Sequence, residues 1–574
     1  MGGETLPKFR DDISIVLCGE AGQGIQTVEY LLTRTLKLAG YNVFSTKEFM
    51  SRIRGGSNST SIRVSSQRVS AFVDRTDILI PLSKGAVEHV SKRISPETVV
   101  LGEREIIGGE YQDNRAVDVP FSEIASEVGG QIYSNTVAVG MLLGLFGVEQ
   151  GILDDYLRQQ FSDKGEKIVQ NNIAAAKKGY EISDDILASG KVAIEIQKSS
   201  EIEDDIIISG TEAVAMGAIA GGCDFVSFYP MSPATGVSVF LAQHSKDFEI
   251  LVEQSEDEIS AVNMMIGAWY AGARAMTSTS GGGFALMEEG LSLAGMLENP
   301  AVIHLGQRPG PATGLPTRTE QGDLLFALYA GHGEFPRIIL APGTMHDAFY
   351  LTQRAFNLAD KYQVPVIILT DQYLLDFYHN TPLPDLSDVE IHKHIVKTDS
   401  QYRRYEITED GISPRGVPGY GDGLVCVDSD EHDEGGHITE DFDLRIRMMD
   451  KRLKKLDGMR EEPVPPKFVG PEDYKILVIG WGSTYSMAKE AVANLGRDDT
   501  ALLHFTQVYP LHPDIAGYLE KAEKLVIVEN NATSQFGSVL KLQTGFEIND
   551  KILKYNGLPF SVEEIESNLR AILS

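Results

Sequence analysis

The run Ile13-Ser-Ile-Val-Leu-Cys18, followed at once by Gly19-Glu-Ala-Gly22-Gln-Gly24, decides the fold class of the N-terminal part of this chain. A helical pattern then extends to about Ala39, and a second apolar run, Val43-Phe-Ser45, comes after a turn. A strand, a glycine turn, a helix and a strand in this order are typical of an open α/β domain with parallel strands.

The same alternation returns twice further along the chain. A second unit begins at Ile206-Ile-Ile-Ser-Gly210 and a third at Lys475–Ile479, where Gly480-Trp-Gly-Ser-Thr484 precedes a helical pattern. Short apolar runs continue each unit, at 225–228, 301–305, 338–340, 366–369, 501–505 and 524–529. The sequence therefore predicts an α/β protein with three doubly wound domains.

Two irregular stretches suggest the domain boundaries. Residues 182–205 are acidic and patternless, whereas residues 392–466 are rich in Gly, Pro and Asp and end in a basic helix around Arg445–Leu456. The second stretch is typical of an insertion that lies over a neighbouring domain. The predicted division is a first domain at 1–180, a linker at 181–205, a second domain at 206–391, an interface segment at 392–466 and a third domain at 467–574.

Composition excludes several classes of protein. The formal net charge of −31 argues against a nucleic-acid partner, and the 574 residues contain no apolar run long enough to span a membrane. No signal-peptide pattern is present, so we expect a cytoplasmic protein. The cysteines, Cys18, Cys223 and Cys426, are far apart, which excludes a disulfide framework, a thiolate zinc site and an iron–sulfur cluster bound by this chain alone.

Two loops in the first domain could bind an anion. Glycines between a strand and a helix, as at Gly19–Gly24, let backbone N–H groups approach a phosphate. The spacing matches neither a dinucleotide fingerprint nor a P-loop, so a tight turn without a ligand is the alternative. The second loop, Ser51-Arg-Ile-Arg-Gly-Gly56, adds two cations and favours an anionic ligand.

The run Glu253-Gln-Ser-Glu-Asp-Glu258 precedes the apolar helix that contains Ala261–Ile266. Acids at this position can stabilise the helix dipole without any further role. The helix is so apolar that it must be buried, and the carboxyl nearest the core then needs a partner. The aminopyrimidine of thiamine diphosphate is such a partner, because its N1′ shares a proton with a buried carboxylic acid.

Six motifs occur in the order known from one family. They are Ser51–Gly56, Tyr229-Pro-Met-Ser-Pro233, Ala275–Ser280, Gln307–Thr317, Glu320-Gln-Gly-Asp323 and His332-Gly-Glu-Phe-Pro336. Over nearly its whole length the chain resembles the 2-oxoacid:ferredoxin oxidoreductases, in particular the alpha subunit with the gamma domain fused ahead of it. The resemblance implies a gamma domain, a thiamine pyrimidine-binding domain and a transketolase C-terminal-like domain. The last two motifs are similar to the 2-oxoglutarate type.

The resemblance also implies roles for single residues. Glu258 would activate the aminopyrimidine as the catalytic group, with Tyr229 and Pro230 also at the cofactor. Ser232 and Arg308 would hold the carboxylate of the 2-oxoacid, for which the planar fork of Arg is well suited. Coenzyme A, the co-substrate, would bind near four residues of the gamma domain: Gly22, Gly24, Arg54 and Gly55.

The parts that this chain lacks imply a partner. A beta subunit would carry the diphosphate–Mg²⁺ site and a [4Fe–4S] cluster, in an (αβ)₂ assembly that passes electrons to ferredoxin. The reaction implied is oxidative decarboxylation of a 2-oxoacid to acyl-coenzyme A and CO₂, which some members run in reverse. Two other classes stay open, a non-oxidative thiamine-dependent decarboxylase and a scaffold without catalysis.

Three local features leave further alternatives. Ser232 stands where the family signature has Thr, which retains the hydroxyl but leaves pyruvate or a branched-chain 2-oxoacid possible as substrate. Gly421-Asp-Gly423 mimics the start of a diphosphate–Mg²⁺ motif, yet no Asn follows at the required distance, so we interpret it as a loop. Asp428–His437 has the residue types of a metal site, but a solvated or interface loop is favoured and no metal ligand is predicted.

Overall fold

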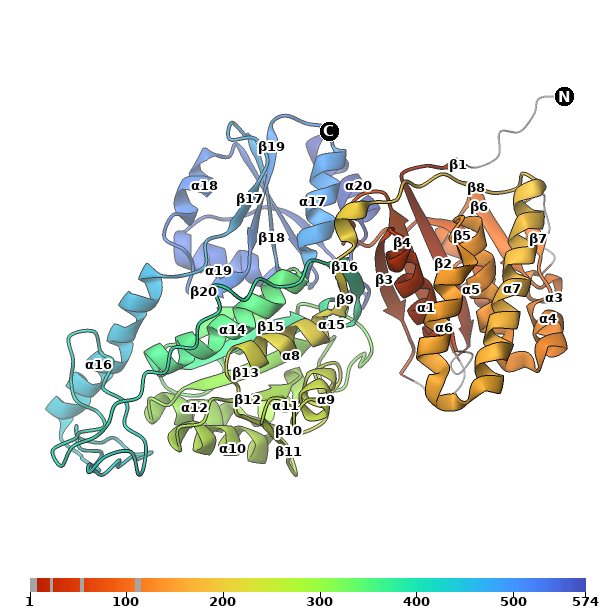
Figure 1. Cartoon of the computed structure of the whole chain (residues 1–574). Coiled ribbons are helices and arrows are strands. Elements are labelled where there is room, and N and C mark those ends of the chain that lie inside the picture. Colours follow the sequence, from red (N-terminus) through yellow and green to blue (C-terminus); the bar gives the residue numbers. More distant parts are fainter. Residues whose placement is uncertain (1–7, 21–23, 52–55, 109–114) are drawn as a thin grey trace. The chain divides into compact units, whose positions relative to one another are not determined.

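The computed structural model describes residues 8–20, 24–51, 56–108 and 115–574. Contacts divide the chain into two compact units, one of residues 1–208 and 377–383, the other of residues 209–376 and 384–574 (Figure 1). Each unit is an α/β structure, which confirms the predicted fold class. In the described residues, none of the helices has the length and apolar character needed to cross a membrane.

The first unit is built on an eight-stranded sheet in the order β7-β6-β5-β2-β4-β3-β16-β9. Its strands are β1 (Lys8–Phe9), β2 (Asp12–Glu20), β3 (Asn42–Glu48), β4 (Ser57–Ser65), β5 (Thr76–Pro81), β6 (Ile94–Gly102), β7 (Ala116–Asp118), β8 (Ala193–Ile194), β9 (Ile206–Ser209) and β16 (Tyr378–Thr381). Its helices are α1 (Ile25–Leu38), α2 (Ala86–His89), α3 (Arg104–Ile107), α4 (Phe121–Val128), α5 (Ser134–Leu145), α6 (Gln150–Phe161) and α7 (Glu166–Ala188).

Strand β2 lies inside this sheet and is buried on both faces. Ile13, Ile15 and Leu17 belong to one apolar cluster, and Val16 and Cys18 to another on the opposite face. A continuous apolar run is what a strand covered on both sides requires, so this element was predictable from its sequence.

The two strands predicted at 13–45, β2 and β3, run in the same direction as expected, but they are not neighbours in the sheet. β2 pairs with β5 in parallel, but β4 lies between β2 and β3 and is antiparallel to both. The connection from Glu48 to Ser57 is too short for the crossover that parallel neighbours need. β4 escaped prediction because its sequence, SNSTSIRVS, is dominated by serine rather than by apolar residues.

The predicted linker at 181–205 is part of the first unit instead of a free connection. Helix α7 continues through its start to Ala188, and Val192, Ile196 and Ile202 are buried. α7 packs so closely on α5 at Gly179 that a Cβ atom there would lie 2.2 Å from the carbonyl oxygen of Val137. The change between units falls after Ile208.

The second unit contains a seven-stranded sheet, β11-β10-β12-β13-β15-β14-β20, and a five-stranded sheet, β17-β19-β18-β21-β22. Its strands are β10 (Phe225–Phe228), β11 (Leu251–Gln254), β12 (Ala275–Thr279), β13 (Ala301–Gln307), β14 (Ile338–Leu340), β15 (Pro365–Asp371), β17 (Lys467–Val469), β18 (Ile476–Trp481), β19 (Thr500–Phe505), β20 (Gln507–Tyr509), β21 (Lys524–Glu529) and β22 (Asp550–Leu553). Its helices are α8 (Gly210–Ala220), α9 (Thr235–Gln243), α10 (Glu258–Tyr270), α11 (Gly281–Leu286), α12 (Glu288–Met296), α13 (Leu324–Tyr329), α14 (Met345–Tyr362), α15 (Gln372–Asp376), α16 (Phe442–Glu461), α17 (Tyr485–Asn494), α18 (Ile515–Lys521), α19 (Gln535–Thr544) and α20 (Val562–Leu573).

Helices cover both faces of the seven-stranded sheet. α8 and α14 pack together on one face, and α10, α11 and α12 lie on the other (Figure 1). The first six strands in this order, from β11 to β14 and including β10 and β15, all run in parallel. β20, from the C-terminal part of the chain, pairs with β14 in the antiparallel direction. A strand from the third predicted domain thus completes the sheet of the second predicted domain.

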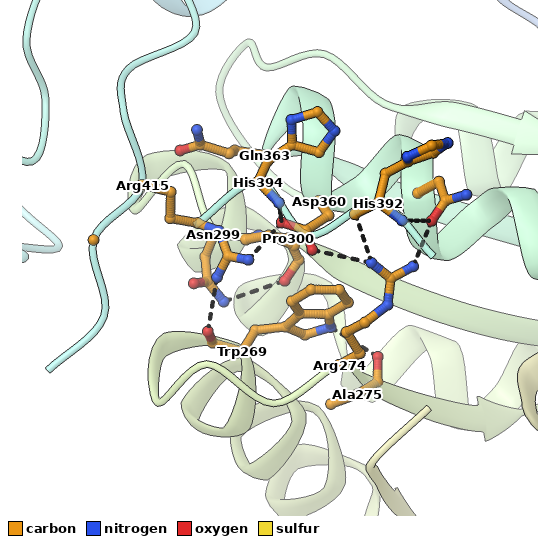
Figure 2. Close-up of polar contacts among 12 residues, drawn as sticks. Trp269, Arg274, Ala275, Asn299, Pro300, Asp360, Gln363, His392, His394 and Arg415 are labelled. Carbon is orange, nitrogen blue, oxygen red and sulfur yellow. Dashed lines mark hydrogen bonds and ion pairs between the residues drawn. The ribbon is translucent and has the colours of Figure 1, made fainter. Parts of the chain in front are cut away.

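Buried charges, rather than a core of its own, hold the irregular segment in place. Residues 382–441 contain no helix or strand, only two isolated bridges. In Figure 2, the buried carboxylate of Asp360 accepts hydrogen bonds from Arg274, Arg415 and the backbone N–H of His394. Arg274 also donates to the carbonyls of His392, at 2.9 Å, and Gly221, and its Nη2 donates to Oδ1 of Asn357.

Helix α16 is attached in the same way. Lys451 and Lys455 each approach the buried carboxylate of Glu298 to 2.6 Å. Burial acts to raise the pKa of Glu298, but the two ammonium groups outweigh it and hold that pKa well below its usual range. A buried ion pair of this kind fixes register, because a shifted helix would leave a charge without a partner.

Candidate active site

The carboxyl edge of the seven-stranded sheet gathers the residues that the sequence singles out. β11, β10, β12 and β13 are neighbours and run in parallel, so the loops that follow them meet at one edge. The loop after β10 carries Tyr229–Pro233, α10 begins at Glu258 after β11, and Arg308 directly follows β13. The fold thus brings together residues from three separate parts of the sequence.

Glu258 is the first residue of α10, yet it does not cap the helix. Asp257 is the N-cap, and its carboxylate accepts a hydrogen bond of 2.8 Å from the backbone N–H of Ser260. Glu258 itself is only 2% exposed, and its Oε1 has no hydrogen-bond partner within the described part of the chain. Burial raises the pKa of Glu258, and the neighbouring charge of Asp257 adds to the effect.

A glycine makes room for this carboxyl. A Cβ atom at Gly283 would lie 2.4 Å from Oε1 of Glu258 and 2.2 Å from Oγ1 of Thr279. Any larger residue at this position would displace Glu258. The sequence carries one signal for this position, the triplet Gly281-Gly-Gly283, which follows the buried strand β12 after a single residue.

Arg308 and Ser232 are in contact, though not through the serine hydroxyl. Nη1 of Arg308 donates a hydrogen bond of 2.8 Å to the backbone carbonyl of Ser232. The side chain of Ser232 is exposed, as are those of Tyr229 and Pro230 in the same loop. Burial lowers the pKa of Arg308, and the charge of Asp323 opposes this effect. The single contact to Ser232 leaves other guanidinium donors of Arg308 available, among them Nε.

Several buried polar atoms at this edge have no hydrogen-bond partner as far as the structure describes the chain, and each is a group that a bound ligand could satisfy. Among the described residues, the atoms here without a hydrogen-bond partner are Oε1 of Glu258, Oγ of Ser280, Nε of Arg308 and Oδ2 of Asp323. Ser280 and Asp323 received no role from the sequence. The four atoms belong to two carboxyls, a hydroxyl and a guanidinium, a set of groups that suits a polar ligand with both donors and acceptors.

A neutral histidine stiffens the sheet just below this edge. His304 is fully buried in β13, with its Nδ1 2.8 Å from Oγ of Ser278 in β12 and its Nε2 2.9 Å from Oγ1 of Thr370 in β15. Burial lowers its pKa to about 3, so the ring is uncharged at neutral pH. Three adjacent strands are thereby tied together beneath the loops.

Of the four residues predicted at coenzyme A, Gly24 alone can be placed, since Gly22, Arg54 and Gly55 lie outside the described residues. Gly24 precedes α1 with a φ of 75° and lines a cavity of about 630 Å³ within the first unit. Asn135 and Thr136 of α5 and Lys164 also line it. The cavity is large enough for part of a cofactor-sized ligand.

The two loops that resemble cofactor or metal motifs, 421–423 and 428–437, make hydrogen bonds and ion pairs within the chain. Gly423 donates its backbone N–H to Oγ1 of Thr398, and Glu431 accepts from Arg445 and Arg452. Asp433 accepts from the backbone of His437 at 3.0 Å. The described residues contain no group of three or more His, Cys, Asp or Glu side chains placed to hold a metal ion.

Comparison with known proteins identifies the family. Residues 216–451 match the family model "Pyruvate flavodoxin/ferredoxin oxidoreductase, thiamine diP-bdg", and residues 14–182 match "Pyruvate ferredoxin/flavodoxin oxidoreductase". The 2-oxoacid:ferredoxin oxidoreductase subunit alpha of a Sulfolobus species is 33% identical over 98% of this chain and 97% of that protein. The chain belongs to the 2-oxoacid:ferredoxin oxidoreductases. It is an oxidoreductase alpha subunit with a thiamine diphosphate-binding domain, and an alpha subunit implies a partner subunit.

Two further relatives of these oxidoreductases cover nearly the whole chain. The 2-oxoglutarate oxidoreductase subunit KorA of Mycobacterium tuberculosis is 28% identical over 98% of this chain and 92% of its own length. A solved 2-oxoglutarate:ferredoxin oxidoreductase from Magnetococcus marinus, with 2-oxoglutarate, coenzyme A and succinyl-CoA bound, superposes with a TM-score of 0.92 at 31% identity. That match covers 98% of this chain and 100% of the other.

The residues at the sheet edge fit a thiamine diphosphate pyrimidine. Its N1′ needs a carboxyl that is buried, protonatable and free of other partners, and Oε1 of Glu258 has all three properties. Gly283 provides the space in which that carboxyl lies.

Proposed function

We propose that this alpha subunit provides the pyrimidine-binding half of a thiamine diphosphate site and works in the oxidative decarboxylation of 2-oxoglutarate. In the proposed reaction, 2-oxoacid, coenzyme A and two oxidised ferredoxins give acyl-coenzyme A, CO₂, two reduced ferredoxins and a proton. The observation that carries the proposal is the buried, unpartnered carboxyl of Glu258 at the edge of the sheet.

Glu258 would hold the proton that activates the cofactor. Its raised pKa favours the protonated carboxyl more than in an exposed glutamate, and a proton on Oε1 can be given and taken back. The absence of a competing partner keeps this oxygen available. When bound, thiamine diphosphate supplies the nucleophilic carbon and the electron sink for decarboxylation.

Arg308 and Ser232 would bind the substrate carboxylate. The contact from Nη1 of Arg308 to the Ser232 carbonyl holds the guanidinium, while its Nε has no hydrogen-bond partner in the described part of the chain. Arg is the residue best suited to pair with a carboxylate, because its planar fork donates two parallel hydrogen bonds. The exposed hydroxyl of Ser232 would add a further donor, with Tyr229 and Pro230 in the same loop next to the cofactor.

The choice of 2-oxoglutarate rests on sequence motifs and on relatives. Glu320–Asp323 and His332–Pro336 are similar to the 2-oxoglutarate type, and the Mycobacterium tuberculosis and Magnetococcus marinus relatives are named for that substrate. Pyruvate and branched-chain 2-oxoacids are the alternatives. Comparing viologen reduction with each of these acids decides between them, and preference for another acid would reject this part of the proposal.

The complete enzyme would need a beta subunit. We assign to it the diphosphate–Mg²⁺ site and a [4Fe–4S] cluster, from which electrons pass to ferredoxin, in an (αβ)₂ assembly in the cytoplasm. The three widely spaced cysteines of this chain support this division, since a cluster normally takes four thiolates. Coenzyme A would contact the first unit near Gly24, where the cavity of about 630 Å³ lies.

The test is the substitution Glu258→Gln in the complex with its partner subunit. Losing the acid–base group should lower kcat by roughly 10²- to 10⁴-fold, while the chain still assembles and the complex keeps its iron–sulfur absorbance. Glu256→Gln is the matched control, because Glu256 is exposed just ahead of the same helix. Retained turnover in the Glu258 variant would reject the assignment.

A further inference from the structure

The first turn of α11, which contains Gly281 and Gly283, lies between two carboxyl groups. On one side, Gly283 faces Oε1 of Glu258; on the other, a Cβ atom at Gly281 would lie 2.6 Å from Oδ2 and 2.8 Å from Oδ1 of Asp323. The lack of side chains in this turn therefore gives room to both acids. Only Glu258 has a role in the reaction described above, so Asp323 needs an explanation of its own.

Asp323 stands at a helix start but does not cap it. It is the N-cap residue of α13, yet its side chain makes no capping hydrogen bond. Gln535 of α19 takes that place: its Oε1 accepts from the backbone N–H of Leu325 at 2.9 Å, and its Nε2 donates to the carbonyl of Gly322 at 2.6 Å. The Asp323 carboxyl therefore does not accept the backbone hydrogen bond that an N-cap side chain usually accepts.

The backbone of Asp323 is fixed next to the end of β13. Its N–H donates to Oε1 of Gln307 at 3.0 Å, and Nε2 of Gln307 donates to the carbonyl of Thr370 at 3.1 Å. Gln307 is the last residue of β13 and directly precedes Arg308, so this contact holds the backbone of Asp323 close to the start of the loop that carries Arg308. Oδ2 of Asp323 is buried and has no hydrogen-bond partner among the described residues.

The guanidinium of Arg308 acts on this carboxyl, and the carboxyl in turn acts on Glu320. Burial raises the pKa of Asp323 to about 6, although the guanidinium of Arg308 at the end of β13 acts in the opposite direction. Glu320, on the loop before α13, has its own pKa raised, first by burial and then by the charge of Asp323. Asp323 therefore changes its charge near pH 6, and the cation that acts on it is the one proposed to bind substrate.

We propose that Asp323 is a protonation switch for substrate binding at Arg308. Protonated Asp323 leaves the guanidinium free for the carboxylate of the 2-oxoacid, whereas ionised Asp323 attracts the guanidinium and repels the incoming anion. Asp323 is a positioning residue in this role, since it acts through Arg308. The inference rests on the proposed function of Arg308 as the carboxylate clamp.

Linkage sets the size of the effect. If a bound 2-oxoacid raises the pKa of Asp323 by about one unit, ionisation of Asp323 weakens binding about tenfold. The KM for the 2-oxoacid should therefore rise about tenfold as the pH rises through the Asp323 pKa of about 6 and beyond. The value of kcat should not share this dependence, because the chemical step uses Glu258.

The experiment measures KM and kcat by viologen reduction in the complete complex across this pH range, for the natural chain and for Asp323→Asn. The natural enzyme should show the rise in KM, and D323N should show a low KM that does not change with pH. Glu320→Gln should keep the natural profile. A flat KM in the natural enzyme, an unchanged profile in D323N, or a profile flattened by E320Q instead would each overturn the proposal.

Arg308→Lys separates this inference from the function on which it rests. Lys lacks the planar fork, so R308K should raise the KM for the 2-oxoacid at every pH. An unchanged KM in R308K would reject Arg308 as the clamp, and with it the proposed substrate site. A raised KM in R308K together with a natural pH profile in D323N would reject the switch alone.

Discussion

Replacing Gly283 by Ala tests how closely the fold controls the carboxyl of Glu258. The new Cβ would lie 2.4 Å from Oε1 of Glu258, and real Cβ contacts are essentially never under 3.0 Å, so the two must separate by at least 0.6 Å. Overpacking of this kind costs about 1–3 kcal/mol of stability. A displacement approaching 1 Å at a catalytic group lowers turnover by up to about 100-fold.

The assay is viologen reduction by the complex, combined with thermal unfolding of the same samples. We expect kcat to fall roughly 10- to 100-fold in G283A, with KM for the 2-oxoacid changing less. Gly267→Ala is the control, because Gly267 lies in the same helix as Glu258 and a Cβ there meets nothing within 4 Å. Full turnover in G283A would refute the claim that Glu258 must stay where the structure has it.

Two further predictions concern the scaffold. Asp360→Asn leaves the buried Arg274 and Arg415 without their counter-charge and should lower the free energy of unfolding by about 3–5 kcal/mol. Asp388→Asn, at an exposed position, is the control and should leave the free energy of unfolding unchanged. Equal melting temperatures of the two variants would contradict this prediction. His304, with its pKa lowered to about 3, binds its proton more readily when unfolded, so its contribution to stability is lost as the pH falls below about 6.5. That loss reaches about 1.4 kcal/mol per pH unit, and unfolding of His304→Gln should depend less on acid than unfolding of the natural chain does.

Much of the fold follows from local sequence. β2, β14 and β15 are largely apolar, as strands covered on both faces must be. The bounds of β10, β14 and β21 agree with those predicted. β4 and β11 were not predicted, because β4 is rich in serine and β11 is largely exposed. Their places depend on pairing partners that local sequence does not specify.

The candidate site was predictable where a single segment carries the signal. Glu258 and Arg308 stand in motifs that the sequence shows directly, and the fold brings them to one edge. Asp323 stands in such a motif too, but its free carboxyl depends on Gln535, which lies 212 residues further along the chain. The role of Gly283 depends on the position of a side chain from another loop.

The central claim is that this chain holds half of an active site and that a second subunit completes it. The most direct measurement is to purify the chain at its native expression level and to assay what accompanies it. The account predicts a co-purifying subunit with a brown iron–sulfur chromophore, and viologen reduction only in fractions that contain both chains. A colourless preparation of this chain alone that decarboxylates 2-oxoacids would contradict it.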